Sequence, residues 1–267
     1  MRSLRLAAVV AASLAAGACL QSTTLIRINA DGSGTIEQTT IMTDAALRQL
    51  RQLAAMGGDT GKPIDFFSTK QAHDMAASLG PGVTVVSSTR IKNADGEGSK
   101  AIFAFADIGQ LDIKHRGAGP VTPGMAAAPV RFSLTHEPDD RAILHITLQQ
   151  ANLVAVNPPT APAGSSGTAK SRMPPEQLAM IKQMFAGMRV TVAVEPAGQL
   201  LKTSSPFVEG QRVTLLELAF DQLIANEAAF SRAQAARSID DVREALKDVP
   251  GLKINLAPEI TIEFAGR

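Results

Sequence analysis

The sequence contains no tryptophan and no tyrosine, and its only aromatic side chains are those of ten phenylalanines. Indole and phenol rings are the usual stacking platforms and the usual anchors of protein interfaces. Their absence disfavours carbohydrate binding by ring stacking and leaves that role to phenylalanine alone.

An excess of charge of either sign is also lacking, since the 267 residues carry 26 basic and 25 acidic side chains. Residues 1–18 hold Arg2 and Arg5 and no acidic residue, so the other 249 residues carry 24 basic and 25 acidic side chains, a net charge of −1. Nucleic acids and anionic lipids attract proteins with a basic excess. We therefore expect no nucleic-acid partner.

Long apolar runs are absent, because no segment reaches the about 20 apolar residues that a transmembrane helix needs. The longest candidate, Leu6–Ala16, is interrupted by Ser13 and follows Arg2 and Arg5. A basic start, a short apolar segment and small residues at its end are typical of a secretory signal. Residues 1–18 are therefore predicted to be a signal peptide, and the rest of the chain is expected to be exported.

The chain has one cysteine, Cys19, and it lies directly after this apolar segment. The sequence Ala16-Gly17-Ala18-Cys19 resembles the lipobox of bacterial lipoproteins. The resemblance implies that Cys19 becomes the first mature residue and that its sulfur carries diacylglycerol, whose acyl chains, such as palmitate, anchor the protein to a membrane. A single cysteine in an exported protein has no intramolecular disulfide partner, so its placement needs such an explanation. Cleavage by a general signal peptidase, which accepts the small-x-small form of residues 16–18, is the alternative.

The same resemblance implies a location in the cell envelope. Among lipoproteins of double-membraned bacteria, Asp after the cysteine often retains the protein in the inner membrane, and here Leu20 stands at that place. The resemblance therefore favours the outer membrane, with the folded body facing the periplasm. One acyl chain anchors only marginally at about 0.8 kcal/mol per buried methylene, whereas two or three chains hold a protein firmly.

Turn signals between β-rich runs predict several hairpins. The first, "DGSG" at Asp31–Gly34, is of the strongest kind, and further turns are expected at 93–98 and 138–140. Apolar periodicity and stop signals predict helices at 45–56, 69–79, 176–188, 220–236 and 238–248. The last of these begins with the form of a capping box at Ser238–Asp241. The predicted fold class is α+β, with antiparallel β-hairpins forming one or two sheets and about four helices packed on a face.

A segment rich in proline, glycine and serine, residues 157–175, divides the chain and is expected to be a loop or a linker. It separates an N-terminal α+β region, residues 19–156, from a C-terminal α+β region, residues 176–267. The two regions form either one domain or two.

Recognisable catalytic chemistry is missing from the sequence. The four histidines, His73, His115, His136 and His145, have no partners at metal-ligand spacing, and the common hydrolase and zinc-enzyme motifs are absent. We therefore predict no metal site and no cofactor. His136 and His145 flank one hairpin, so an unidentified enzyme that uses both of them is a third functional hypothesis.

Two other hypotheses come first. The leading one is a non-catalytic interaction or scaffold module, attached to the membrane through lipid on Cys19 and binding a protein or lipid partner whose identity the sequence does not give. The alternative is a carrier of lipid or of another apolar ligand. It rests on the apolar stripe of the helix predicted at 176–188, and it places Met184, Phe185 and Phe103 around a cavity between sheet and helix.

Overall fold

The computed structural model describes most of the chain from the first strand onward. The described residues are 20–48, 51, 67–114, 129–148, 187–236 and 238–266. The predicted signal peptide, Cys19, the segment 157–175 and residues 176–186 of the helix predicted at 176–188, with Met184 and Phe185, lie outside them, and the described Gly187 and Met188 are not helical. Within the described segments, no helix has the length and apolar character required to span a membrane.

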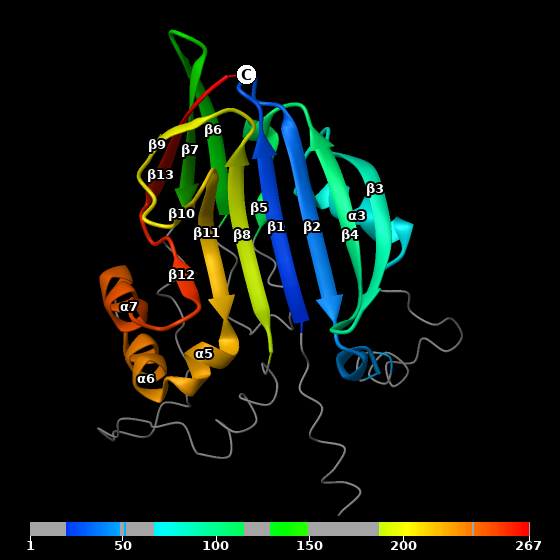
Figure 1. Cartoon of the computed structure of the whole chain (residues 1–267), viewed down its shortest axis with the longest axis vertical. Helices are drawn as coiled ribbons and strands as arrows, with labels where there is room; N and C mark the ends of the chain where they lie inside the picture. The colour runs from blue at the N-terminus through cyan, green and yellow to red at the C-terminus, as the bar shows by residue number, and fades with distance from the viewer. Residues whose placement is uncertain are drawn as a thin grey trace, which may run out of the picture.

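The larger of two sheets has eight strands (Figure 1). Across this sheet the strands run in the order β10 (Val208–Glu209), β11 (Arg212–Ala219), β8 (Arg189–Pro196), β1 (Leu20–Ile28), β2 (Gly34–Met42), β4 (Gly96–Phe105) and β3 (Thr84–Asn93), and β12 (Leu252–Ile254) pairs with β11. All neighbours are antiparallel except β1 and β8, which pair in parallel. The sequence predicted antiparallel hairpins only, so this parallel pair is an addition to the prediction.

The smaller sheet has five strands, all antiparallel to their neighbours. Its order is β5 (Ile113–Lys114), β6 (Pro129–Glu137), β7 (Arg141–Leu148), β13 (Glu259–Ala265) and β9 (Leu200–Thr203). Each sheet combines strands from before and after the central segment, because β1 pairs with β8 and β7 pairs with β13.

The predicted hairpins form where the turn signals lie. In the β1–β2 hairpin, Gly32 adopts a positive φ of 86°, which glycine reaches without steric cost. The carboxylate of Asp31 accepts hydrogen bonds from the hydroxyl of Ser33 at 2.6 Å and from its backbone N–H at 2.9 Å. These two bonds, the hydroxyl first, lower the pKa of Asp31. The charged turn residue is thereby fixed in the conformation that reverses the chain.

The main core lies between the two sheets, whose inner faces pack on each other. The larger sheet contributes Ile26, Ile36 and Phe103, and the smaller sheet contributes Leu144 and Phe264, all fully buried in one apolar cluster. Burial of each such side chain stabilises the fold by about 1.5–3 kcal/mol. Along β13 the fully buried Ile260, Ile262 and Phe264 occupy alternate positions, as the period of a half-buried strand requires.

The helices do not form the predicted layer on a sheet face. In the part of the chain that the structure describes, α3 (Thr69–Leu79) lies beside β3 and β5, at one open side between the sheets. A short 3₁₀ helix, η1 (Ile108–Gln110), packs beside β6. The helices α5 (Phe220–Ala225), α6 (Glu227–Ala235) and α7 (Ile239–Leu246) gather at one end of the larger sheet (Figure 1). The structure fits the α+β class, but the number and packing of the described helices differ from the prediction. The two inner faces largely cover each other, and α3 covers part of one face by itself.

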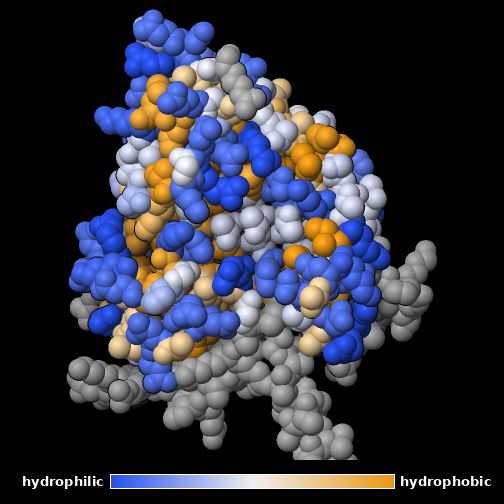
Figure 2. All heavy atoms as spheres, viewed as in Figure 1, coloured by the Kyte–Doolittle hydropathy of each residue, from blue (hydrophilic) through white to orange (hydrophobic). Residues whose placement is uncertain are grey.

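The outer face of the larger sheet is hydrophilic and faces the viewer in Figure 2. Ion pairs cross it from strand to strand. Glu37 pairs with Lys100 at 2.7 Å and with Arg27 at 3.2 Å. Glu195 pairs with the same Arg27 at 3.6 Å and with Arg212 at 3.3 Å. The network connects five neighbouring strands, β4, β2, β1, β8 and β11.

Candidate functional site

The inner face of the larger sheet changes in character along its strands. At one level it carries Ile26, Ile36 and Phe103, which lie under the smaller sheet. After Ile36, the next two inward-facing positions along β2 and the register partners beside them are mostly polar. Those polar inward positions are Thr24, Gln38 and Ser88 at the first level and Ser22, Thr40 and Ser99 at the second.

Helix α3 covers part of this polar region. Its N-cap is Ser68, whose hydroxyl accepts a hydrogen bond from the backbone N–H of Gln71 at 3.3 Å. Ala72 and Ala76 are its buried residues, so small side chains let the helix approach the sheet closely. Gly80 ends the helix with a φ of 137°, and a Cβ there would lie 2.3 Å from the carbonyl oxygen of Gln110.

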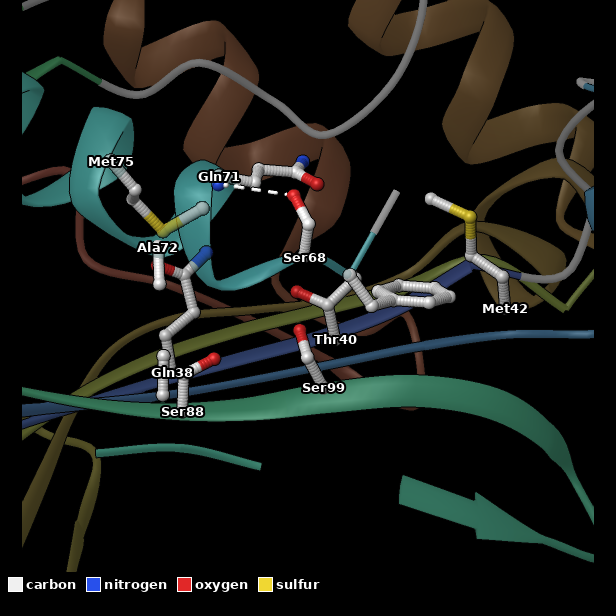
Figure 3. Close-up of a pocket in the computed structure, with 11 residues that line it drawn as sticks. Gln38, Thr40, Met42, Ser68, Gln71, Ala72, Met75, Ser88 and Ser99 are labelled. Atoms are coloured by element: carbon white, nitrogen blue, oxygen red, sulfur yellow. Dashed lines mark hydrogen bonds between the residues drawn. The ribbon is translucent and has the colours of Figure 1, made fainter. Parts of the chain in front are cut away.

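A pocket of about 190 Å³ remains between α3 and the sheet (Figure 3). Its walls come from β2, β3, β4, helix α3 and the residue preceding the N-cap. The lining residues are Gln38, Thr40, Met42, Phe67, Ser68, Gln71, Ala72, Met75, Ser88, Ser99 and Ala101.

The pocket is lined by both polar and apolar groups. On the sheet side, Gln38, Thr40, Ser88 and Ser99 present an amide and three hydroxyls, as Figure 3 shows. These groups donate and accept hydrogen bonds without carrying charge. Among the described residues, none of these four side chains has a recorded hydrogen-bond partner. They are therefore the groups that a ligand's hydroxyl, ester or amide would meet.

The apolar lining residues come from both walls of the pocket. Met42 and Ala101 belong to the sheet, and Phe67, Ala72 and Met75 belong to α3 or directly precede it, where Ser68 and Gln71 add polar groups. Methionine side chains are flexible and polarisable and adapt to the shape of a ligand. None of the described lining residues is ionisable. An isolated charge placed in such a pocket would lose its hydration without gaining a partner. The arrangement therefore fits an uncharged molecule that has one hydrogen-bonding part and one apolar part.

Charged residues lie beyond the pocket rather than inside it. Glu97, the register partner of Met42, forms ion pairs with Arg90 at 3.6 Å and with Arg51 at 3.9 Å. The carboxylate of Glu97 thus faces two guanidinium groups at the end of the sheet, and the three groups together carry a net charge of +1. At this end of the sheet, the inward-facing side chain of Glu97 is therefore charged, whereas the described side chains that line the pocket are not.

No protein-family model matches the chain, and no curated protein is significantly similar to it. Among solved structures, the NMR structure of the folded domain of LppM from Mycobacterium tuberculosis is similar over 94% of this chain and 91% of that chain. The two are 14% identical, with a TM-score of 0.34. This likeness contributes nothing to the functional argument, which rests on the geometry of the pocket and on the sequence.

Of the ligand-binding residues predicted from the sequence, Phe103 is the one within the described residues, and it is not among those that line this pocket. Phe103 is fully buried in the main core, next to the pocket-lining Ala101 on the same face of β4. Met184 and Phe185 lie outside the described residues. The pocket nevertheless lies between a helix and a sheet, the kind of place that the carrier hypothesis requires.

The structure does not bring His136 and His145 together. Nε2 of His136 donates to the carbonyl oxygen of Ala30 at 2.8 Å and so ties the smaller sheet to the β1–β2 hairpin. His145 lies between the buried Leu144 and Ile146 and therefore points to the opposite, outer face. There its Nδ1 donates to Glu259 at 2.6 Å. The described residues contain no group of three or more potential metal ligands.

A hydroxyl, a histidine and a carboxylate do stand in a row on that outer face. The hydroxyl of Thr135 lies 3.4 Å from Nε2 of His145, whose Nδ1 contacts Glu259. The Thr135 hydroxyl lies equally far, at 3.4 Å, from the carbonyl oxygen of Ile143. Both contacts of this hydroxyl are longer than the about 2.5–3.0 Å of an ordinary hydroxyl hydrogen bond. These contacts connect β6, β7 and β13 on the outer face of the smaller sheet.

The pocket was missed in the sequence, although one signal pointed to it. In β2 the inward positions after the buried Ile36 are Gln38, Thr40 and Met42. Polar residues on the inward face of a strand need a partner or a cavity. The other half of the site, helix α3, is brought to these residues only by the tertiary fold.

Proposed function

We propose that this protein is a lipid-anchored, non-catalytic protein of the bacterial cell envelope that binds a small uncharged amphiphile between α3 and the larger sheet. The observation that carries the proposal is the pocket, whose lining combines uncharged hydroxyl and amide groups with apolar side chains. The anchor is supported by the lipobox-like Ala16-Gly17-Ala18-Cys19, and an outer-membrane location by Leu20 after the cysteine.

The size of the pocket limits the ligand. Sites for drug-sized ligands usually measure about 300–1,000 Å³. At about 190 Å³, this one holds a small molecule or one part of a longer lipid. An uncharged head such as the glycerol and ester of a monoacylglycerol would satisfy the polar lining groups, and its first methylenes would contact Met42 and Met75.

The same residues argue for binding rather than catalysis. General acid–base catalysis needs a titratable group within hydrogen-bond reach of the substrate, and the described residues that line the pocket include no such group. The scaffold function predicted from the sequence stays a prediction, since no surface among the described residues identifies a protein partner.

The intact mass of the membrane-extracted protein tests the anchor. The full chain is expressed in a double-membraned bacterium and extracted from its membranes, and its intact mass is measured by mass spectrometry. We expect the mass of residues 19–267 plus diacylglycerol and an N-terminal acyl chain, and Cys19→Ser should lose both the added mass and the membrane attachment. An unmodified mass, or a Cys19→Ser variant that is retained equally, would contradict the anchor.

The pocket is tested with N-phenyl-1-naphthylamine, an uncharged amphiphilic fluorophore that brightens on leaving water. Ala72, which lines the pocket, and Ala77, which is exposed on the same helix, give a matched pair. Ala72→Leu fills the pocket and should weaken fluorophore binding at least tenfold, whereas Ala77→Leu should leave it unchanged. Equal binding by both variants, or no binding by the unmodified protein, would exclude this pocket as the site.

A further inference from the structure

We propose that the end of the larger sheet at which β1 begins is a membrane-contact surface, and that its partner is the bilayer holding the lipid on Cys19. The inference rests on the lipid attachment in the proposed function. It adds an orientation of the folded body and a source for the ligand.

The chain leaves no room for a linker between anchor and fold. Leu20 is the first residue of β1, is 7% exposed and directly follows Cys19 in the sequence. Consecutive Cα atoms are about 3.8 Å apart, so the lipid-bearing residue lies within about 4 Å of the sheet. A flexible tether of several residues would let the body rotate freely above the membrane. One peptide bond does not.

The strand register shows what else lies at this end. Leu20 pairs with Met42 at the end of β2, and Gln21 pairs with Arg189 at the start of β8. Neighbouring strands are about 4.8 Å apart, so the Cα atoms of Met42 and Arg189 lie within about 10 Å of that of Cys19. The turn between β3 and β4 reaches the same level, because Met42 also pairs with Glu97.

The opposite end is held far from the bilayer. A strand rises about 3.3 Å per residue, so the nine residues of β1 place the β1–β2 turn about 30 Å from its start. The β6–β7 hairpin projects at that far end (Figure 1). If the strands run perpendicular to the membrane, labels at the two ends of the sheet lie at very different distances from the lipid.

The orientation places the pocket beside the bilayer. Met42 lines the pocket and is the register partner of Leu20, so the pocket reaches the strand pair next to the anchor. A lipid whose head enters the pocket would have to move only a short distance out of the membrane. The ligand source that we infer is therefore the supporting bilayer, and the ligand class is a lipid with an uncharged head.

The contact is imposed by the covalent lipid and does not need electrostatic attraction. Residues 19–267 carry 24 basic and 25 acidic side chains and have no cationic excess to draw them to anionic lipid. The orientation should therefore persist at high salt, unlike that of a protein held by a basic patch.

Fluorescence quenching measures the orientation directly. Lipidation consumes the only natural thiol, so Asp95→Cys in the exposed β3–β4 turn and Glu137→Cys at the exposed far end of β6 each carry one bimane label. The lipidated full chain is reconstituted in vesicles of phosphatidylethanolamine and phosphatidylglycerol that contain a headgroup nitroxide lipid. We expect at least threefold stronger quenching at position 95 than at 137, at both about 50 mM and about 500 mM salt. Screening of exposed charges is much stronger at the higher concentration.

Two failures can be told apart by the intact mass of the reconstituted protein. Equal quenching of both labels in a protein that carries the lipid would overturn the orientation alone. A protein without lipid would remove the anchor of the proposed function, and the contact surface with it.

A second measurement needs no substitution. Lys92 lies near the β3–β4 turn, and Lys202 lies beside the far part of β13, where it pairs with Glu263; both are exposed. A water-soluble acylating reagent should modify Lys92 at least threefold more slowly on vesicles than in detergent-free Cys19→Ser protein, with Lys202 unchanged. Unchanged modification of both lysines would speak against the contact.

Discussion

At the scale of single residues, two adjacent threonines show how strand alternation separates roles. Thr39 and Thr40 follow each other in β2, and successive side chains of a strand point to opposite faces. Thr40 therefore lines the pocket, whereas Thr39 lies opposite Lys100 and Thr23 on the outer face. The same chemical group contributes to binding at one position and to the hydrophilic surface at the next.

This pair gives a residue-scale prediction. Thr40→Val keeps the shape and the β-propensity of the side chain but removes its hydroxyl, which costs a bound ligand about 1 kcal/mol. We expect monooctanoylglycerol to displace N-phenyl-1-naphthylamine about fivefold less effectively from Thr40→Val than from the unmodified protein, with direct binding of the fluorophore little changed. Thr39→Val is the matched control and should behave as the unmodified protein. Identical displacement curves for the two variants would show that this hydroxyl does not bind the head of the ligand.

At the scale of elements, the parts predicted correctly are those fixed by neighbouring residues. The hairpin at Asp31–Gly34 and the helix α3 at Thr69–Leu79 form where their turn and stop signals lie. The capping box is also confirmed, since the Ser238 hydroxyl accepts from the N–H of Asp241 and the Asp241 carboxylate accepts from the N–H of Ser238. Each of these depends on contacts within a few residues, which one sequence can reveal.

The helix expected over residues 220–236 shows where a local pattern was misread. The structure divides it into α5 and α6 at Asn226. The side chain of Asn226 accepts a hydrogen bond from the N–H of Ala229 at 3.0 Å and so begins a new helix. Apolar periodicity continues through both helices, but asparagine is among the best N-caps. The cap overrode the periodicity.

Ion pairs across the strands of the larger sheet give the element-scale prediction. The hydrogen bond from Lys100 lowers the pKa of Glu37 below its ordinary value of 4.5, and Arg27 lowers it further against the effect of partial burial. Because the folded-state pKa is depressed, the stabilisation is fully present above about pH 4.5 and is lost as the pH falls through the folded-state value. Glu37→Gln should therefore cost about 1 kcal/mol of unfolding free energy at pH 7 and much less at pH 3.

Urea denaturation followed by far-ultraviolet circular dichroism at both pH values measures this difference. Glu209→Gln is the control, since Glu209 is exposed and has no ion pair with another described residue. It should shift the midpoint little at either pH. A cost of Glu37→Gln that stays constant from pH 7 to pH 3 would mean that ionisation of Glu37 does not stabilise the sheet.

At the scale of the whole molecule, the order of the strands in space differs from their order in the sequence. β1 lies between β2, its neighbour in the chain, and β8, which follows only after the long central segment. β7 likewise pairs with β13 near the C-terminus. Pairings between such distant segments leave no local signal, so neither the parallel β1–β8 pair nor the packing of the two sheets was predicted from the sequence. The pocket shares this origin, because it depends on strands and a helix that only the complete fold brings together.

Shared sheets have a consequence for unfolding. Because strands from residues 20–148 and from residues 189–265 complete both sheets, neither set can bury its inner face without the other. We expect one cooperative transition in which amide-exchange protection of β2 and of β11 is lost at the same urea concentration. Val194→Ala in β8, a fully buried position, should lower both midpoints together and cost about 2 kcal/mol, whereas Val208→Ala at an exposed position should leave both near the unmodified value. Separate midpoints for β2 and β11 in mass-spectrometric exchange would instead mean that the two parts of the chain fold as independent units.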